Sequence, residues 1–169
     1  LVNKGLEVME AKWLFGVDLD QIEVVVQPQS VIHSMVQFVD GAVIAQLGTP
    51  DMKLPIQYAL YYPDRRYLAG ERLDFAKLGQ ITFEKPDMET FLGLPLALKA
   101  SREGGSMPTV FNAANERAVS KFLHREIGFT DIYQIIIESM EQHKSIQQPT
   151  IEEILDTEKA TYEFIESRW

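Results

Sequence analysis

The residues best suited to chemistry near the start of the chain are Asn3, Lys4 and Glu7. Helical periodicity places Lys4 and Glu7 on the same side of one helix. Asn3 is a suitable N-cap, and the free N–H groups of a helix start, together with a lysine, could hold a phosphate. Glu7 falls on an apolar sector, where a buried carboxylate needs an ionic partner or a metal ion. Two interpretations remain open: a structural Lys4–Glu7 ion pair, or a phosphate and metal site.

A second candidate pair, Ser30 and His33, lies in a β-rich stretch. Strand alternation puts Val31, His33 and Met35 on one face, so we expect His33 to have apolar neighbours. A histidine in such a place is either a buried core residue or a catalytic group. Ser30 follows a Pro-Gln turn and is either a local cap or a ligand. The sequence contains neither the Gly-x-Ser-x-Gly motif of serine hydrolases nor the His-Glu-x-x-His motif of zinc peptidases.

The elements that must position these residues follow from hydrophobic patterning. A largely buried helix is predicted over residues 1–15. An antiparallel meander follows, with a hairpin turn at Asp40-Gly41, and its strands are predicted at 21–27, 30–39 and 42–47. A short helix over 54–61 precedes an irregular connector over 63–92, which contains a short strand over 80–84.

Helical patterning returns in the last part of the chain. Thr150 and Glu153 form a capping box that starts the final helix. Short links between the helices predict a small bundle, with helices over 88–102, 109–126, 130–143 and 150–167. The predicted fold class is α+β: an antiparallel sheet meander with flanking helices, followed by a small C-terminal helical bundle.

Composition restricts the classes of function. The 169 residues include no cysteine, which excludes disulfides, thiol catalysis and cysteine-ligated metals and fits a cytoplasmic setting. The formal charge of −9 argues against a nucleic-acid backbone as the main partner. We also expect no membrane span, because no run of about 18 apolar residues occurs, and no signal peptide is visible.

Three long stretches closely resemble the 1-deoxy-D-xylulose 5-phosphate reductoisomerase family. They are NKGLEVMEAKWLFGV (3–17), PQSVIHSMVQFVDGAVIAQLGTPDMKLPIQYAL (28–60) and FNAANERAVSKFL (111–123). The resemblance covers nearly the whole chain but only the later part of that enzyme, so we expect a piece of a longer protein. It implies a partial catalytic domain over 1–62, a connector over 63–92 and a four-helix C-terminal domain over 93–169.

Members of this family convert 1-deoxy-D-xylulose 5-phosphate to 2-C-methyl-D-erythritol 4-phosphate in isoprenoid precursor synthesis. They rearrange the carbon skeleton and reduce an aldehyde with NADPH, with Mg²⁺ or Mn²⁺ polarising the substrate's oxygens. The resemblance implies that Asn3 and Lys4 contact the substrate phosphate and that Glu7 is a metal ligand. A carboxylate suits such a hard cation.

For the β-rich stretch, the resemblance implies that Ser30 contacts the substrate and that His33 is a catalytic residue. Pro50 and Met52 match a turn near the nicotinamide. Gln27 stands where the family usually has histidine, and a neutral amide cannot titrate. The parts of the family that carry its nucleotide-binding domain and its Asp-x-Glu metal motif have no counterpart in this sequence. We therefore expect the chain to be inactive in isolation.

The resemblance further implies a homodimer formed through the sheet, with residues 22–47 available as an edge. One alternative is a non-catalytic interaction module that keeps this dimerisation surface. Another is an unrelated metal-dependent enzyme built on Glu7 and His33, although two such residues supply too few ligands.

Overall fold

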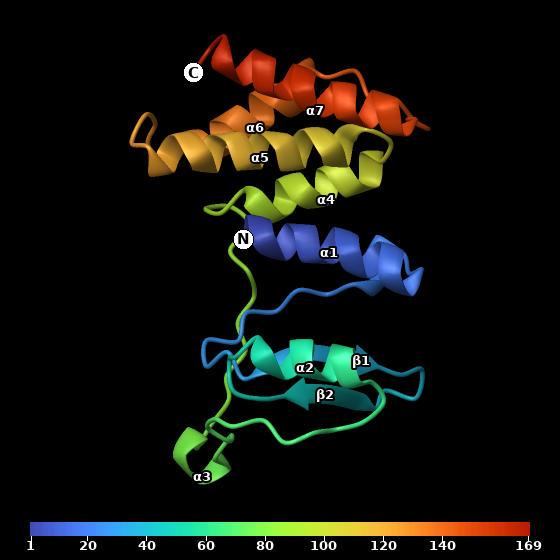
Figure 1. Cartoon of the computed structure of the whole chain (residues 1–169), viewed down its shortest axis with the longest axis vertical. Helices are drawn as coiled ribbons and strands as arrows, with labels where there is room; N and C mark the ends of the chain where they lie inside the picture. The colour runs from blue at the N-terminus through green and yellow to red at the C-terminus, as the bar shows by residue number, and fades with distance from the viewer. The chain divides into compact units, whose positions relative to one another are not determined.

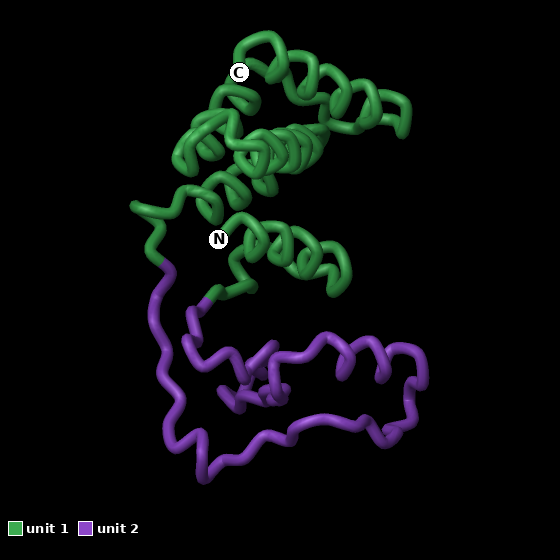
Figure 2. The backbone as a smooth tube through the Cα atoms, turned by 60° about the vertical axis from the view of Figure 1, so that its left-hand side comes forward, with its two compact units in different colours: residues 1–24, 87–169 green, residues 25–86 purple.

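The computed structural model describes all 169 residues, which form seven α-helices and one two-stranded antiparallel sheet. The backbone divides into two compact units, one of residues 1–24 and 87–169 and the other of residues 25–86 (Figure 2). The predicted α+β class is confirmed. The domain boundaries of the longer protein stay a prediction. None of the helices has the length and hydropathy needed to cross a membrane.

The first unit is a stack of helices around one apolar core (Figure 1). Its helices are α1 (Val2–Phe15), α4 (Gly93–Glu103), α5 (Met107–Leu123), α6 (Asp131–Gln142) and α7 (Ile151–Glu166). Helix α5 contacts α4, α6 and α7, and its Val110 and Phe111 are fully buried. Ile135 of α6 and Ile165 of α7 complete the centre of the core. The four predicted C-terminal helices are therefore confirmed, with ends shifted by a few residues.

Helix α1 packs against α4 at very short range. An ideal Cβ on Gly5 would lie 2.3 Å from the Cβ of Ala97, so only a glycine allows this approach. The prediction that α1 is largely buried is wrong at its C-terminal end, where the exposed fractions of Trp13, Leu14 and Phe15 are 79%, 78% and 75%. The reason is that α4 covers only one face of α1.

The second unit contains the sheet. Strand β1 (Ile32–Gln37) pairs with β2 (Val43–Leu47), and helices α2 (Lys53–Tyr61) and α3 (Phe75–Leu78) follow. The predicted hairpin turn is confirmed: the Phe38 N–H donates to the Ala42 carbonyl over 2.8 Å.

The predicted strands over 21–27 and 80–84 are wrong. Each contributes one residue to an isolated antiparallel bridge, Val26 with Glu84. Leu19–Gln21, at the start of the first stretch, forms a 3-10 turn in which the Asp18 N–H donates to Gln21 Oε1 over 2.9 Å. The β-branched run satisfied the strand pattern, but a strand also requires a continuous hydrogen-bonded neighbour.

A hydrogen-bonded clasp joins the α4–α5 corner to the link between α6 and α7. Ser106 is fully buried and makes hydrogen bonds to this link in both directions. Its N–H donates to the Ile146 carbonyl over 2.9 Å. The Ile146 N–H donates to Ser106 Oγ over 2.9 Å, and Ser106 Oγ lies 2.7 Å from His143 Nε2. Since Oγ already accepts one hydrogen bond, its own hydrogen is free to point at Nε2, which suits a neutral imidazole.

We expect this clasp to make folding stability depend on pH. Burial lowers the pKa of His143 below 6.5, while the charge of Glu103 acts in the opposite direction. The unfolded chain therefore takes up the proton first, so the free energy of unfolding should fall as pH drops from about 7.5 to about 5.

Urea unfolding followed by circular dichroism at these two pH values would measure the change. His143→Gln keeps an acceptor for Ser106 but does not titrate, so it should remove the fall. His124→Gln, at the exposed end of α5, is the control and should leave the fall intact. An equal fall in all three proteins would contradict the assignment.

Candidate active site

The charged group near the start of α1 gathers around the Glu7 carboxylate. The Asn3 side-chain amide donates to Glu7 Oε1 over 2.7 Å, and Lys4 Nζ pairs with Glu7 Oε2. The predicted i,i+3 ion pair is thus present. Asn3 is not the N-cap, because the helix begins at Val2 with Leu1 in the cap position.

The expectation that Glu7 is buried is wrong. The side chains of Lys4 and Glu7 are each 44% exposed, because α4 leaves this side of α1 uncovered. The carboxylate therefore needs no buried partner to be tolerated, and both of its neighbours can exchange with solvent or with a ligand. An exposed ion pair of this kind contributes only about 0–1 kcal/mol to stability.

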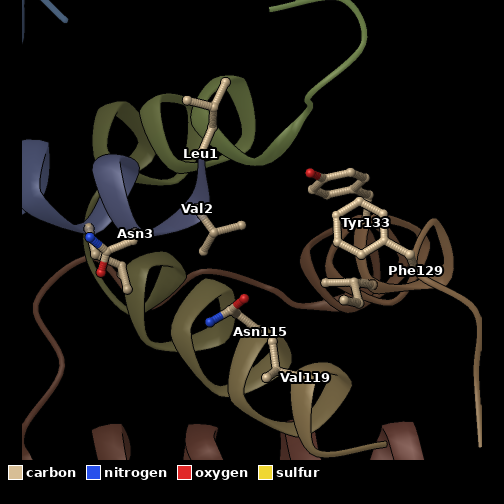
Figure 3. Close-up of a pocket in the computed structure, with 9 residues that line it drawn as sticks. Leu1, Val2, Asn3, Asn115, Val119, Phe129 and Tyr133 are labelled. Carbon is tan, nitrogen blue, oxygen red and sulfur yellow. The ribbon is translucent and has the colours of Figure 1, made fainter. Parts of the chain in front are cut away.

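A cavity lies beside the first turn of α1, with Asn3 among its walls (Figure 3). Its volume is about 330 Å³. Most of the lining is apolar, and the polar groups are the amides of Asn3 and Asn115 and the hydroxyl of Tyr133; the other lining residues are Leu1, Val2, Leu6, Val119, Phe129 and Ile132. No charged side chain lines the cavity, so it is poorly suited to a phosphate. A phosphate would instead meet α1 on the side of Lys4.

His33 is the extra residue of a β-bulge. Ile32 pairs with Leu47 while Ser34 pairs with Gln46, so one residue is inserted in β1 between two successive pairs. The predicted alternation over this strand is therefore wrong, and so is a core role for His33, which is exposed. Bulges commonly redirect a side chain next to a functional site.

The His33 ring reaches the turn that precedes α2. Its Nε2 lies 3.3 Å from the Gly48 carbonyl, and the Gly48 N–H donates to the Val31 carbonyl over 3.0 Å. Because a carbonyl can only accept, Nε2 is the protonated nitrogen in this arrangement. Nδ1 is then left as an acceptor for another group.

Pro50 and Met52 occupy this turn. Met52 is 71% exposed, so its apolar side chain is open to solvent. Asp51 stabilises the turn, since its Oδ1 accepts from the Lys53 N–H over 2.9 Å. Ser30 is also exposed and lies in the same unit, just before β1.

The structure therefore brings the candidate residues together in two sets. Asn3, Lys4 and Glu7 form one set on α1. The other set lies around the start of β1 and the turn before α2, and it consists of Ser30, His33, Pro50 and Met52. The pair formed by the buried Ser106 and the partly buried His143 was not predicted from the sequence, because the two residues are far apart in sequence and no motif connects them.

The donor atoms of this chain do not fit a complete site for a divalent ion. No three His, Asp or Glu side chains come together anywhere among the 169 residues. Glu7 with the Asn3 amide falls short of the roughly six oxygen ligands that Mg²⁺ prefers. Glu7 can be at most one ligand among several.

Comparisons with known proteins agree on one family. The family model of the DXP reductoisomerase C-terminal domain matches residues 47–164. The chain is 63% identical over 169 residues to the 1-deoxy-D-xylulose 5-phosphate reductoisomerase of Agathobacter rectalis, and equally so to that of Lachnospira eligens. Each match covers 100% of this chain and 44% of the relative.

Solved structures are similar as well. The reductoisomerase of Zymomonas mobilis in complex with NADPH is 42% identical with a TM-score of 0.92, covering 98% of this chain and 44% of that one. A DOX-P reductoisomerase in complex with NADPH, fosmidomycin and magnesium is 39% identical with a TM-score of 0.93, covering 98% and 43%. The chain spans less than half the length of these relatives, and it belongs to the 1-deoxy-D-xylulose 5-phosphate reductoisomerase family.

Proposed function

We propose that this chain supplies part of the active site of an enzyme that converts 1-deoxy-D-xylulose 5-phosphate to 2-C-methyl-D-erythritol 4-phosphate. The observation that carries the proposal is the gathering of Asn3, Lys4 and Glu7 on one exposed side of α1. It combines a cation, an amide donor and a carboxylate within two helical turns. These groups suit a phosphorylated sugar that reacts beside a divalent ion.

Lys4 and Asn3 would bind the substrate phosphate, and Ser30 would add a hydroxyl contact to the substrate. The phosphate has to compete with Glu7 for both Lys4 and Asn3. That competition is weak for a half-exposed ion pair. A lysine on a flexible stem can turn from one anion to another.

The cofactors of the proposed reaction are NADPH and Mg²⁺ or Mn²⁺. When bound, NADPH supplies the hydride and the divalent ion polarises the substrate's oxygens. In this chain Glu7 would be one ligand of the ion, and the Pro50–Met52 turn would offer an exposed methionine to the flat nicotinamide ring. The remaining metal ligands and the nucleotide site would lie in the part of the full-length protein that this chain does not include. We therefore expect the isolated chain to be inactive.

The proposal includes a division of the chain into a partial catalytic domain over 1–62, a connector over 63–92 and a C-terminal domain over 93–169. It also includes a cytoplasmic homodimer that associates through the hairpin. Support for the dimer comes from a set of exposed apolar side chains on and around β1 and β2, namely Met35, Val36, Phe38, Val39, Val43 and Ile44. So many exposed apolar side chains on one hairpin are typical of an association surface. This feature would also serve the alternative function, a non-catalytic dimerisation module.

Lys4→Ala in the full-length protein tests the phosphate role. We expect KM for 1-deoxy-D-xylulose 5-phosphate to rise about 10- to 100-fold, because a hydrogen bond to a charged group contributes about 1.5–3 kcal/mol. The turnover number should change little, since a phosphate grip acts equally on substrate and transition state. Steady-state kinetics would measure both. Lys99→Ala, an exposed lysine on α4, is the matched control, and an unchanged KM in Lys4→Ala would refute the role.

A further inference from the structure

Ser30 has a backbone conformation that a serine rarely adopts. Its φ is 52°, in the left-handed region that favours glycine. Its N–H donates to the Gln27 carbonyl over 3.0 Å, which closes a four-residue turn through Pro28 and Gln29. A non-glycine residue keeps such a conformation only where its surroundings enforce it.

The side chain of Gln27 provides that enforcement. Its Oε1 accepts from the N–H groups of Val31, over 2.8 Å, and Ile32, over 3.3 Å. These are the two residues that directly follow Ser30, so the amide holds the chain on the far side of the turn. Its Nε2 donates to Gln29 Oε1 over 2.7 Å, so the same amide also holds the turn from within.

A second glutamine ties the turn to a distant part of the same unit. Gln29 Nε2 donates to Thr82 Oγ1 over 2.9 Å, and the Thr82 N–H donates to Gln29 Oε1 over 3.2 Å. Gln29 Oε1 therefore accepts from both Gln27 and Thr82. The turn that carries Ser30 is anchored on both sides by side-chain amides.

We infer that Gln27 is a positioning residue for the reductoisomerase reaction, acting through Ser30. Its carboxamide holds the Ser30 backbone in the left-handed conformation and thereby directs the Ser30 hydroxyl to the substrate. The inference rests on the proposed function, in which Ser30 contacts the substrate. Among uncharged side chains of this length, only glutamine can accept two backbone N–H groups on its amide oxygen and also donate from its amide nitrogen.

An amide also makes this geometry independent of pH. A neutral imidazole at position 27 could still accept from the backbone through one nitrogen and donate from the other. A protonated imidazole carries a hydrogen on both nitrogens and cannot accept at all. With Gln27 the turn keeps its acceptor at every pH.

The test uses the full-length enzyme with 1-deoxy-D-xylulose 5-phosphate. Gln27→Ala should raise KM by about tenfold, with a smaller change in kcat, because hydrogen bonds that hold Ser30 in place are lost. Gln27→His should keep a KM near that of the parent above about pH 7.5. As pH falls through the ordinary titration range of imidazole, the ratio of its KM to that of the parent at the same pH should rise. Gln80→Ala, an exposed glutamine with a free side chain, is the control.

Ser30→Gly separates this inference from the proposed function, because glycine adopts φ near 52° without a clamp but lacks the hydroxyl. If Gln27 acts through Ser30, the double variant Gln27→Ala/Ser30→Gly should have the same KM as Ser30→Gly alone. An additive rise, or a pH-independent KM ratio for Gln27→His, would overturn the inference. A rise in Ser30→Gly but not in Gln27→Ala would overturn it and leave the proposed function standing. An unchanged KM in Ser30→Gly would refute the substrate role of Ser30, and the inference with it.

Discussion

Replacing Glu7 by glutamine in the full-length enzyme is expected to lower kcat/KM by more than about 100-fold. Losing a residue that only orients a metal ligand already costs roughly 10- to 100-fold, so losing a ligand itself should cost more. Glutamine has the same length and still offers an oxygen to Asn3 and Lys4, so α1 should be undisturbed. What it lacks is the negative charge that a hard divalent ion requires.

Activity measured against Mn²⁺ concentration separates the metal role from the structural one. A lost ligand should shift the concentration for half-maximal activity upward, and excess metal should restore part of the rate. A purely structural ion pair would instead change the melting temperature slightly and leave the metal dependence unchanged. Glu152→Gln, an exposed carboxylate on α7, is the control. Full activity of Glu7→Gln at limiting Mn²⁺ would rule out the ligand assignment.

Local signals predicted the helices well. The capping box at the start of α7 is present on both sides: the Thr150 N–H donates to Glu153 Oε2 over 2.8 Å, and the Glu153 N–H donates to Thr150 Oγ1 over 3.2 Å. The hairpin turn was predicted in the same way, from two neighbouring residues. Helices and tight turns depend on contacts within a few residues, which a single sequence displays directly.

Contacts between distant segments explain what the sequence did not predict. The stretch 21–27 has a strand composition but finds a partner only at Glu84. The burial of α1 depended on how many helices would cover it, and α4 covers one face only. The bulge at His33 results from the register between β1 and β2, which no residue of β1 alone determines.

The candidate site was predictable as chemistry but not as geometry. The pairing of Lys4 with Glu7 follows from helical spacing and is present. The exposure of Glu7 and of His33 was not foreseen, because both predictions assumed that an apolar neighbourhood in sequence means a buried face. For Gln27, the sequence showed only a departure from histidine, whereas its two backbone acceptor bonds became visible in the structure.

Removal of the His33 imidazole is the other substitution that we expect to cause a large loss of activity, besides Glu7→Gln. We expect His33→Ala to lower kcat by about 10²–10⁴-fold if the ring exchanges a proton with the reacting substrate, the usual contribution of such a group. The structure leaves its Nδ1 side available, because Nε2 faces the Gly48 carbonyl. The ring also ties β1 to the turn that carries Pro50 and Met52, so loss of activity in His33→Ala alone would not identify which role matters.

His33→Gln distinguishes the two roles. A glutamine amide can still donate a hydrogen bond to the Gly48 carbonyl, but it cannot take up or release a proton near neutral pH. If His33 only anchors the turn, Gln should restore most of the activity lost in His33→Ala, and KM for NADPH should recover with it. If His33 is catalytic, both variants should be equally slow, while KM for NADPH in His33→Gln stays near that of the parent. We expect the second result, because the bulge exposes the ring, and an anchor for a surface turn does not need a side chain that can titrate.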